Sequence, residues 1–494
     1  MTPRVIGPAP RRTQVRPGKE GTRMSLCLGA DPSRSAAARR WWVLATVAAG
    51  QFMLVVDAFI VNVAIPSIRT ALDASGAEIE AVIAVYQIAF ATLLVTGGRL
   101  GDIHGRKPVF LCGLLGFTLS SLWCGLAQTG MELVMARLAQ GACAALVSPQ
   151  VLATIHALFP DHQARAKAFG LYGIALGMGG GVGYALGGWL VALDLGGLGW
   201  RTVFLVNLPV GGMLAGVAWK LMPGGGERPE VRLDLAGAGL LFASLMCVLV
   251  PILVARDWGW PVWLLAVELS GAAGLVAFLR LQGAIERRGG APLMDPGLLR
   301  DRGFRLGLGA MALLFLGNLS FYLVVTLFLQ GGLGLAPFAA GLTMLPLIAA
   351  FIAGSRRGAG KVARRGAAAL ARGAMVMCLG IAACLGLIAA QRSPAPWAMA
   401  LTFALFGYGQ GAVMASLMGV ALASVGQANA GTGSGVLATT QQIANGVGVA
   451  VLGAVYFTVQ AAYSDRGAVL SALGVLGAIG VGTTLVLRRL SCRQ

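Results

Sequence analysis

The stretch Gly98-Arg-Leu-Gly-Asp-Ile-His-Gly-Arg-Lys107 lies between two long apolar runs, at approximately 80–97 and 108–128. Each run is close to the roughly 20 apolar residues that a helix needs to cross a bilayer. Within the stretch, the glycines permit tight turns and close helix approach, and an aspartate, two arginines and a lysine bring opposite charges together. The pattern predicts a short charged loop that joins two membrane-spanning helices.

Apolar runs of this kind dominate the chain. Of its 494 residues, 57% are hydrophobic and 12% are charged, and the charged share is about half that of a typical soluble domain. A soluble protein of this length needs far more polar surface, so the composition disfavours a soluble enzyme, a disordered chain and a nucleic-acid-binding domain. The runs are also too long and continuous for the strands of a membrane barrel. We predict fourteen spans, approximately at 42–66, 80–97, 108–128, 131–155, 167–191, 202–221, 233–254, 261–282, 306–329, 336–354, 367–390, 396–423, 432–458 and 467–487.

The basic residues follow the predicted topology. The net charge of +19 would suggest nucleic acid in a soluble protein. When the N-terminus is placed in the cytoplasm, however, 32 of the 38 lysines and arginines fall on the cytoplasmic side, five fall on the other side and Arg137 falls inside a span. This asymmetry satisfies the positive-inside rule. It favours fourteen spans with both termini in the cytoplasm. It also indicates that the basic residues reflect contact with the lipid bilayer and not binding of nucleic acid.

Two parts of the chain repeat each other. Gln163-Ala-Arg-Ala begins the fifth span and Gln427-Ala-Asn-Ala begins the thirteenth, and Gly181-Val-Gly and Gly446-Val-Gly follow at nearly the same offset. Related halves around a site near the bilayer midplane are typical of secondary transporters. We therefore predict an all-α polytopic membrane protein with 14 transmembrane helices, built from two six-helix halves and a central inserted helix pair.

The predicted boundaries are 41–222 for the N-terminal half, 232–283 for the inserted pair and 303–488 for the C-terminal half. Residues 1–40 are basic and lack the apolar core of a signal peptide. We expect them to form a disordered cytoplasmic tail. Met24 is an alternative start to Met1.

Several chemical functions have no support in the sequence. The eight cysteines are scattered without a CxxC pair, and the three histidines are dispersed, which disfavours structural disulfides and metal sites. No glycine-rich loop carries the Lys and Ser or Thr that would bind a nucleotide phosphate. We expect a protein that is not an enzyme and that uses no cofactor, no metal and no ATP.

Four stretches of the chain resemble motifs of the major facilitator superfamily, and they occur in the right order. The loop at 98–107 resembles the signature loop of that superfamily. The others are Val56-Asp-Ala-Phe-Ile-Val-Asn-Val-Ala-Ile-Pro66, Arg137-Leu-Ala-Gln-Gly141 and Trp200-Arg-Thr-Val-Phe-Leu-Val-Asn-Leu-Pro-Val-Gly211. With fourteen spans, the chain is most similar to the drug:proton antiporter branch, and Thr439-Thr-Gln-Gln-Ile-Ala-Asn-Gly446 resembles a segment of that branch. The resemblance covers approximately residues 40–490.

The resemblance implies a function and a place in the cell. It implies a multi-pass protein of a bacterial inner membrane, working as a monomer, that exports small amphipathic organic compounds such as drugs, antibiotics or natural products. Inward proton movement would drive the export, so the partners are a small-molecule substrate, protons and the lipid bilayer. Two alternatives stay open: a transporter of another mode, such as an importer or a lipid or metabolite exporter without strict proton antiport, and a membrane-embedded sensor or enzyme.

The chain departs from the motifs of that branch at three positions. The motif of the first span has Thr where this chain has Phe59, and the signature loop often has Arg where it has Ile103. The antiporter motif of the fifth span has Pro after the glycine that corresponds to Gly183, and here Tyr184 follows. A helix without that Pro lacks its kink, and this difference motivates the alternative without strict antiport.

Asp57, Arg137 and Glu268 are charged residues deep inside predicted spans, where a charge costs about 2.5–3.5 kcal/mol on insertion scales. Asp57 lies nine residues before Pro66, the expected outer end of its span, and hence ~13 Å deep, whereas Arg137 lies six residues into its span and ~9 Å deep. At similar depth they can compete for one proton or pair directly, and a coupling role is favoured over a static ion pair. Glu268 lies ~10 Å deep in the eighth span and is interpreted as reaching the interface.

Three further sets of residues complete the predicted site. The first is the conformational switch in the loop after the second span, whose alternative role is only to set topology: Gly98, Gly101, Asp102, Gly105, Arg106 and Lys107. The second is a close helix contact in the fifth span: Gly179, Gly183, Gly187 and Gly188. The third is a largely apolar substrate cavity with a few polar groups: Tyr86, Gln87, Gln140, Asn318, Tyr322, Gln410, Gln442 and Asn445.

Overall fold

The fold was obtained as a computed structural model, and its described part consists of helices and turns, with no strand. Residues 1–31 lie outside the described part, as do both candidate start residues. Residues 32–40, which we predicted to be disordered, are helical and belong to the first helix. The described residues are 32–159, 161–224, 234–255, 258–259, 261–288, 290, 292–293, 296–423, 425 and 430–492.

The helices follow the predicted order of two halves and an inserted pair. The first half contains α1 (Pro32–Leu72), α2 (Gly76–His104), α3 (Arg106–Leu126), α4 (Gly130–Leu158), α5 (His162–Leu193), α6 (Thr202–Leu205) and α7 (Asn207–Leu221). The inserted pair is α8 (Leu235–Val254) and α9 (Trp263–Arg287). The second half contains α10 (Arg302–Leu327), which continues into a π-helical turn (Phe328–Gly332), then α11 (Pro337–Arg365), α12 (Ala367–Ala390), α13 (Pro396–Leu422), α14 (Ala430–Ala462) and α15 (Asp465–Ser491).

Within the described part, thirteen helical segments are long and apolar enough to cross a membrane. They match the predicted spans except the fifth. That position is occupied by α5, a 32-residue helix whose apolar part is Met178–Leu193. The all-helical polytopic fold is therefore confirmed, and the number of spans agrees with the predicted fourteen when α5 is included.

Local sequence explains where several helices begin. Ser75 and Glu78 form a capping box at α2: the Glu78 backbone N–H donates to the Ser75 hydroxyl at 3.2 Å, and the Ser75 backbone N–H donates to the Glu78 carboxylate at 2.9 Å. Such pairs satisfy backbone donors that have no partner in the first turn. The side chains of Thr129, Asp161 and Asp234 cap α4, α5 and α8 by a single bond each, in which the side-chain oxygen accepts a backbone N–H of the first turn.

Some predicted boundaries are wrong. The predicted loop at 98–107 is helical except at Gly105, where α2 ends and α3 begins, and Gly105 has a φ of 89° that favours glycine. Pro66 does not end the first span, because α1 continues to Leu72. The sixth span is divided into α6 and α7, and α11 continues past the predicted end of the tenth span to Arg365.

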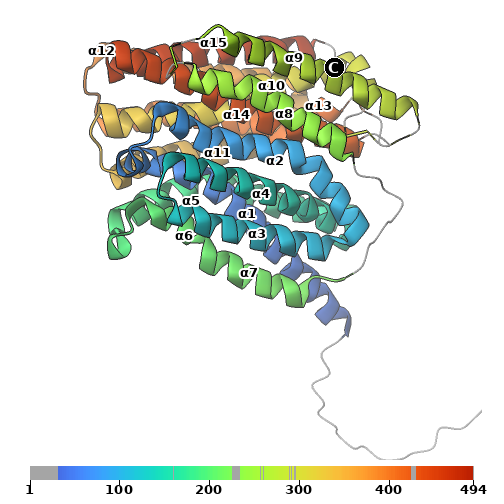
Figure 1. Cartoon of the computed structure of the whole chain (residues 1–494). Coiled ribbons are helices and arrows are strands. Elements are labelled where there is room, and N and C mark those ends of the chain that lie inside the picture. The colour runs from blue at the N-terminus through green and yellow to red at the C-terminus, as the bar shows by residue number, and fades with distance from the viewer. Residues whose placement is uncertain are drawn as a thin grey trace, which may run out of the picture.

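The two halves lie side by side, with α1–α7 in the lower part of Figure 1 and α10–α15 in the upper part. The inserted helices α8 and α9 pack against each other, and α8 contacts α2 and α14. The halves meet along two pairs of helices, α2 with α14 and α5 with α11. The first residues of α1 and the last residues of α15 lie toward the same end of the bundle, on the right in Figure 1.

Candidate functional site: a buried ion pair in the N-terminal half

Asp57 on α1 and Arg137 on α4 form a direct ion pair inside the first half. Arg137 Nη1 lies 2.6 Å from Asp57 Oδ2, and the two side chains are 1% and 0% exposed. The residues are 80 positions apart in the sequence. The sequence predicted only that they lie at similar depth, from the number of residues between each one and the outer end of its span. Because isolated charges are so costly in an apolar interior, their contact explains how both are accommodated here.

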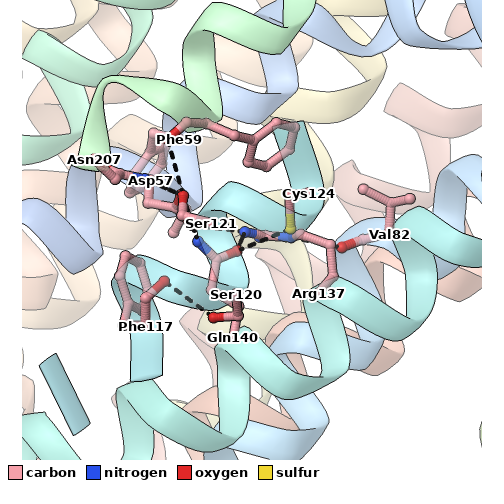
Figure 2. Close-up of polar contacts among 12 residues, drawn as sticks. Asp57, Phe59, Val82, Phe117, Ser120, Ser121, Cys124, Arg137, Gln140 and Asn207 are labelled. Atoms are coloured by element: carbon pink, nitrogen blue, oxygen red, sulfur yellow. Dashed lines mark hydrogen bonds and ion pairs between the residues drawn. The ribbon is translucent and has the colours of Figure 1, made fainter. Parts of the chain in front are cut away.

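The other carboxylate oxygen of Asp57 accepts two amide hydrogen bonds. Gln140 Nε2 donates to Asp57 Oδ1 at 3.1 Å, and Asn207 Nδ2 donates to the same atom at 2.8 Å. Both amides also donate to the Ser121 hydroxyl, which in turn donates to the backbone carbonyl of Phe204. The amides of Gln140 and Asn207 approach Asp57 from α4 and α7 in Figure 2. The side chain of Asp57 is thus contacted by donors from two different helices, α4 and α7.

Arg137 is fixed on several sides. Its Nη1 also donates to Gln140 Oε1 at 2.5 Å, and its Nε donates to the backbone carbonyl of Val82 on α2 at 3.1 Å. The guanidinium carbon lies 4.2 Å from the centre of the Tyr86 ring, a distance suited to a cation–π interaction. The ion pair therefore connects α1, α2 and α4, and protonation of Asp57 would weaken this connection.

The sequence indicated only part of this network. Gln140 was expected to line the substrate cavity, but it is fully buried between Asp57 and Arg137. Its position three residues after Arg137 on one helix was a usable signal, because such residues share a face. Asn207 was present in a recognised motif as a polar residue in an apolar run, but was assigned no role. Ser121 had no comparable signal.

The residues of the predicted switch attach α2 and α3 to neighbouring segments. Arg106 Nη1 donates to the backbone carbonyl of Ala153 on α4 at 2.9 Å, and Lys107 lies over the ring of Trp219 on α7 at 5.4 Å. At Gly101 an added Cβ would collide with the Gln150 side chain. These contacts stay within the first half, so whether this segment acts as a switch remains a prediction.

The fifth-span glycines allow two different close contacts. A Cβ added at Gly179, Gly183 or Gly187 would lie 2.7–2.9 Å from atoms of α1, which belongs to the same half. A Cβ added at Gly188 would instead lie 2.7 Å from the backbone carbonyl of Pro337 on α11. Only Gly188 among these four therefore makes its close contact across the boundary between the halves.

The predicted cavity residues form separate groups. Tyr86 lies against Arg137, and Gln87 is buried beside it in sequence. In the second half, the Tyr322 hydroxyl donates to Gln410 Oε1 at 3.0 Å, and Gln410 Nε2 donates to Asn318. On α14, Asn445 Nδ2 donates to Gln442 Oε1 at 3.4 Å. These groups lie on helices of both halves, and their role in a cavity remains a prediction.

Two other expectations concern ionisable groups. Glu268 lies half-buried on α9 in the inserted pair, whereas the hydrogen bonds described around Asp57 come from Arg137, Gln140 and Asn207. Among the residues that the structure describes, no group of three or more His, Cys, Asp or Glu side chains is arranged to hold a metal ion.

The sequence of the chain is similar to those of several known proteins. The sequence profile of the Major Facilitator Superfamily matches residues 47–449. The chain is 38% identical to the "Probable actinorhodin transporter" of Streptomyces coelicolor over 95% of this chain and 80% of that protein. It is 35% identical to the puromycin resistance protein of Streptomyces alboniger, covering 90% of this chain and 86% of that protein. A multidrug resistance protein of Mycobacterium tuberculosis is 32% identical over 82% of this chain and 74% of its own length.

Solved structures share the fold at low sequence identity. A D-xylose–proton symporter has a TM-score of 0.64 at 15% identity, covering 90% of this chain and 97% of that one. A bacterial homologue of the human lysosomal transporter Spinster, in an inward-facing conformation, has a TM-score of 0.62 at 17% identity, covering 94% of this chain and 96% of that one. The profile, the relatives and the shared fold agree with the motifs around Asp57 and Arg137. The chain belongs to the Major Facilitator Superfamily, and it is a multi-pass membrane transporter.

Proposed function

We propose that this protein exports small amphipathic organic compounds, antibiotics among them, across a bacterial plasma membrane in exchange for protons. Relatives named for antibiotic transport or resistance, at 35–38% identity over most of the chain, support the substrate class. The excess of basic residues in the loops and tails of one predicted side supports an orientation with both termini in the cytoplasm. A monomer in the bilayer is sufficient, since the site lies within one chain.

The buried Asp57–Arg137 pair is the single observation that supports proton coupling. A proton on Asp57 removes the negative charge that Arg137 Nη1 meets at 2.6 Å. Arg137 then holds an uncompensated charge in an apolar interior, which is costly, and so favours another arrangement of α1, α2 and α4. Because an ionisable residue inside a membrane protein is functional by default, we assign Asp57 as the proton carrier and Arg137 as its partner.

The remaining predicted residues receive supporting roles. The segment around Gly105, Arg106 and Lys107 stabilises one of the alternating states through its contacts with α4 and α7. Gly188 allows α5 to lie close to α11, where the halves move against each other. Tyr86, Gln87, Asn318 and Gln410 line the substrate path when the halves separate.

One observation favours a second mode, transport without strict proton exchange. Tyr184 stands where the antiporter motif has Pro, and α5 contains no Pro between His162 and Leu193. The helix therefore lacks the kink that Pro imposes.

Inverted membrane vesicles with an acidic interior test the proposal. Puromycin is added as the probe, its uptake is measured directly, and the pH gradient is followed with a fluorescent dye. Proton antiport requires puromycin uptake together with partial collapse of the gradient. In Asp57→Asn both signals should fall to the background of empty vesicles. Puromycin uptake without any collapse would instead support the second mode.

Asp73→Asn is the matched control, because it makes the same chemical change at an exposed residue near the end of α1. Asp73 has a positive φ of 47°, and Asn tolerates this conformation well. This variant should transport like the parent protein. If Asp57→Asn also retains coupled transport, Asp57 is not the proton carrier.

A further inference from the structure

Two positions at which this chain departs from its family's motifs lie against each other. Phe59 stands on α1 where the motif has Thr, and Tyr184 stands on α5 where the motif has Pro. Their ring centres are 6.0 Å apart, with an angle of 55° between the ring planes. Both substitutions place an aromatic ring at the same point in the interior, so we treat them as one structural unit.

A third ring comes from the other half of the protein. Tyr322 on α10 stacks on Tyr184, with ring centres 5.4 Å apart and planes 29° apart. Phe59 meets Tyr322 edge-on, with ring centres 5.2 Å apart and planes 84° apart. These are the two geometries that aromatic pairs prefer. We call Phe59, Tyr184 and Tyr322 the aromatic triad.

The triad crosses the boundary between the halves. Tyr184 belongs to the first half and Tyr322 to the second, so any movement that separates the halves at this level must break the Tyr184–Tyr322 stack. The backbone of Tyr184 is closely packed, because a Cβ added at Gly341 on α11 would lie 2.9 Å from its carbonyl oxygen. The side chains of Tyr184 and Tyr322 are buried in this structure, at 1% and 7% exposed. If the two halves separated at this level, the two rings would line opposite sides of the space between them.

Polar groups surround the triad. The Tyr322 hydroxyl donates to Gln410, which is itself linked to Asn318. The buried Tyr184 hydroxyl lies near the Thr326 hydroxyl, and neither makes a hydrogen bond of normal geometry in this state. A buried polar atom without a hydrogen bond requires an explanation, and a ligand group that enters in another state is one. The site therefore combines two flat apolar faces with hydroxyl and amide groups at their edges.

We propose that the aromatic triad binds the planar aromatic ring system of a substrate that also carries hydroxyl or carbonyl groups. The ring system inserts between Tyr184 and Tyr322 and replaces their mutual stacking with two new stacking contacts. Its polar groups bond with the Tyr184 hydroxyl and with the amides of Gln410 and Asn318. The inference rests on the proposed export of organic compounds and narrows their class, and it predicts preference for flat aromatic molecules over equally apolar aliphatic ones.

Equilibrium dialysis of the purified full-length protein in detergent tests this without any proton gradient. The two probes are 1,8-dihydroxyanthraquinone, which is planar and aromatic, and progesterone, which is apolar and largely saturated. The parent protein should bind the anthraquinone more tightly. Tyr184→Leu and Tyr322→Leu should each weaken anthraquinone binding on the order of tenfold, and progesterone binding should change less than twofold.

Two controls keep the test decisive. Tyr184→Phe retains the ring and loses only the hydroxyl, so it should keep most of the affinity. Thermal unfolding in detergent selects variants that are folded, and Tyr184→Met replaces Tyr184→Leu if the latter is not. Equal binding of both probes by the parent, or equal loss of both in the Leu variants, overturns the proposal. If the protein binds the anthraquinone selectively but shows no proton exchange, the inferred binding site is supported and the proposed proton coupling is wrong.

Discussion

The side-chain amide of Asn207 donates a 2.8 Å hydrogen bond to Oδ1 of Asp57, although the two residues are 150 positions apart. Asn207 begins α7, the last helix of the first half, and Asp57 lies in the middle of the first helix. The carboxylate on the first helix is therefore positioned in part by the last helix of this half. Each donor around it offers a separate test of how the ion pair works.

Removal of the Asn207 amide should weaken the site. Asn207→Ala loses the hydrogen bonds to Asp57 and Ser121, and a buried hydrogen bond to a charged group contributes about 1.5–3 kcal/mol. We expect lower thermal stability and slower puromycin-driven proton movement in vesicles. Asn62→Ala is the matched control, because the Asn62 amide is equally buried and donates only to backbone carbonyls of its own helix. A control variant with the same transport defect would contradict a specific role for Asn207.

Removal of one charge of the ion pair should lower the stability of the protein more than removal of both charges. Arg137→Gln leaves the carboxylate of Asp57 buried without its cation, and breaking a buried pair on one side costs about 3–5 kcal/mol. In the double variant Asp57→Asn, Arg137→Gln, both charges are gone, so we expect much of the stability to return while proton-coupled transport stays absent. Thermal unfolding of the two variants in detergent measures the difference.

The exposed Arg357 on α11 provides the control for this comparison. Arg357→Gln should unfold at the same temperature as the parent protein. Additive losses in the double variant, rather than recovery, would show that Asp57 and Arg137 do not depend on each other.

Bulk at Gly188 should obstruct movement between the halves. Gly188→Ala places a methyl group 2.7 Å from the Pro337 carbonyl oxygen on α11, which forces α5 and α11 apart. We expect transport to fall at least tenfold, a change that corresponds to about 1.4 kcal/mol. Gly216→Ala on α7 is the control, because nothing lies within 4 Å of its added Cβ. This variant should transport normally and gain slight stability, since Ala is the better helix former.

The proposed orientation can be tested with an impermeant thiol reagent on intact cells. Cys492 is exposed at the end of α15, and Tyr463, between α14 and α15, is 83% exposed at the other end of that helix. In a variant that keeps Cys492 alone, intact cells should not be labelled. When Cys492 is replaced and Tyr463→Cys is introduced, they should be labelled. The reverse pattern would place both termini outside the cell.

Much of the architecture was predictable because membrane spans depend on properties that a sequence displays directly. Apolar runs gave the helices, and the distribution of arginines gave a topology in which Asp57 and Arg137 lie at similar depth. Helix ends were less predictable. Pro66 was expected to end a span, yet neighbouring helices can accommodate Pro inside a membrane helix, and α1 continues past it.

The rotation of each helix about its axis was the main unknown. In a run that is apolar on all sides, sequence does not determine which face meets which neighbour. This is why Ser121 and Asn207 could not be assigned to Asp57, and why Phe59 and Tyr184 were noted only as separate departures from a motif. Their contacts with Tyr322 depend on how α1, α5 and α10 pack together.

The long sequence separation within the Asp57 site also bears on how the protein is made. Asp57 enters the membrane with α1, its counter-charge arrives 80 residues later with α4, and the amide of Asn207 arrives 150 residues later with α7. An unpaired aspartate in a nascent membrane helix costs about 2.5–3.5 kcal/mol, and the apolar length of α1 must offset this cost until synthesis reaches α4. The first half can thus reach its final packing only when α7 has been inserted, which makes this half a single unit of biosynthetic assembly.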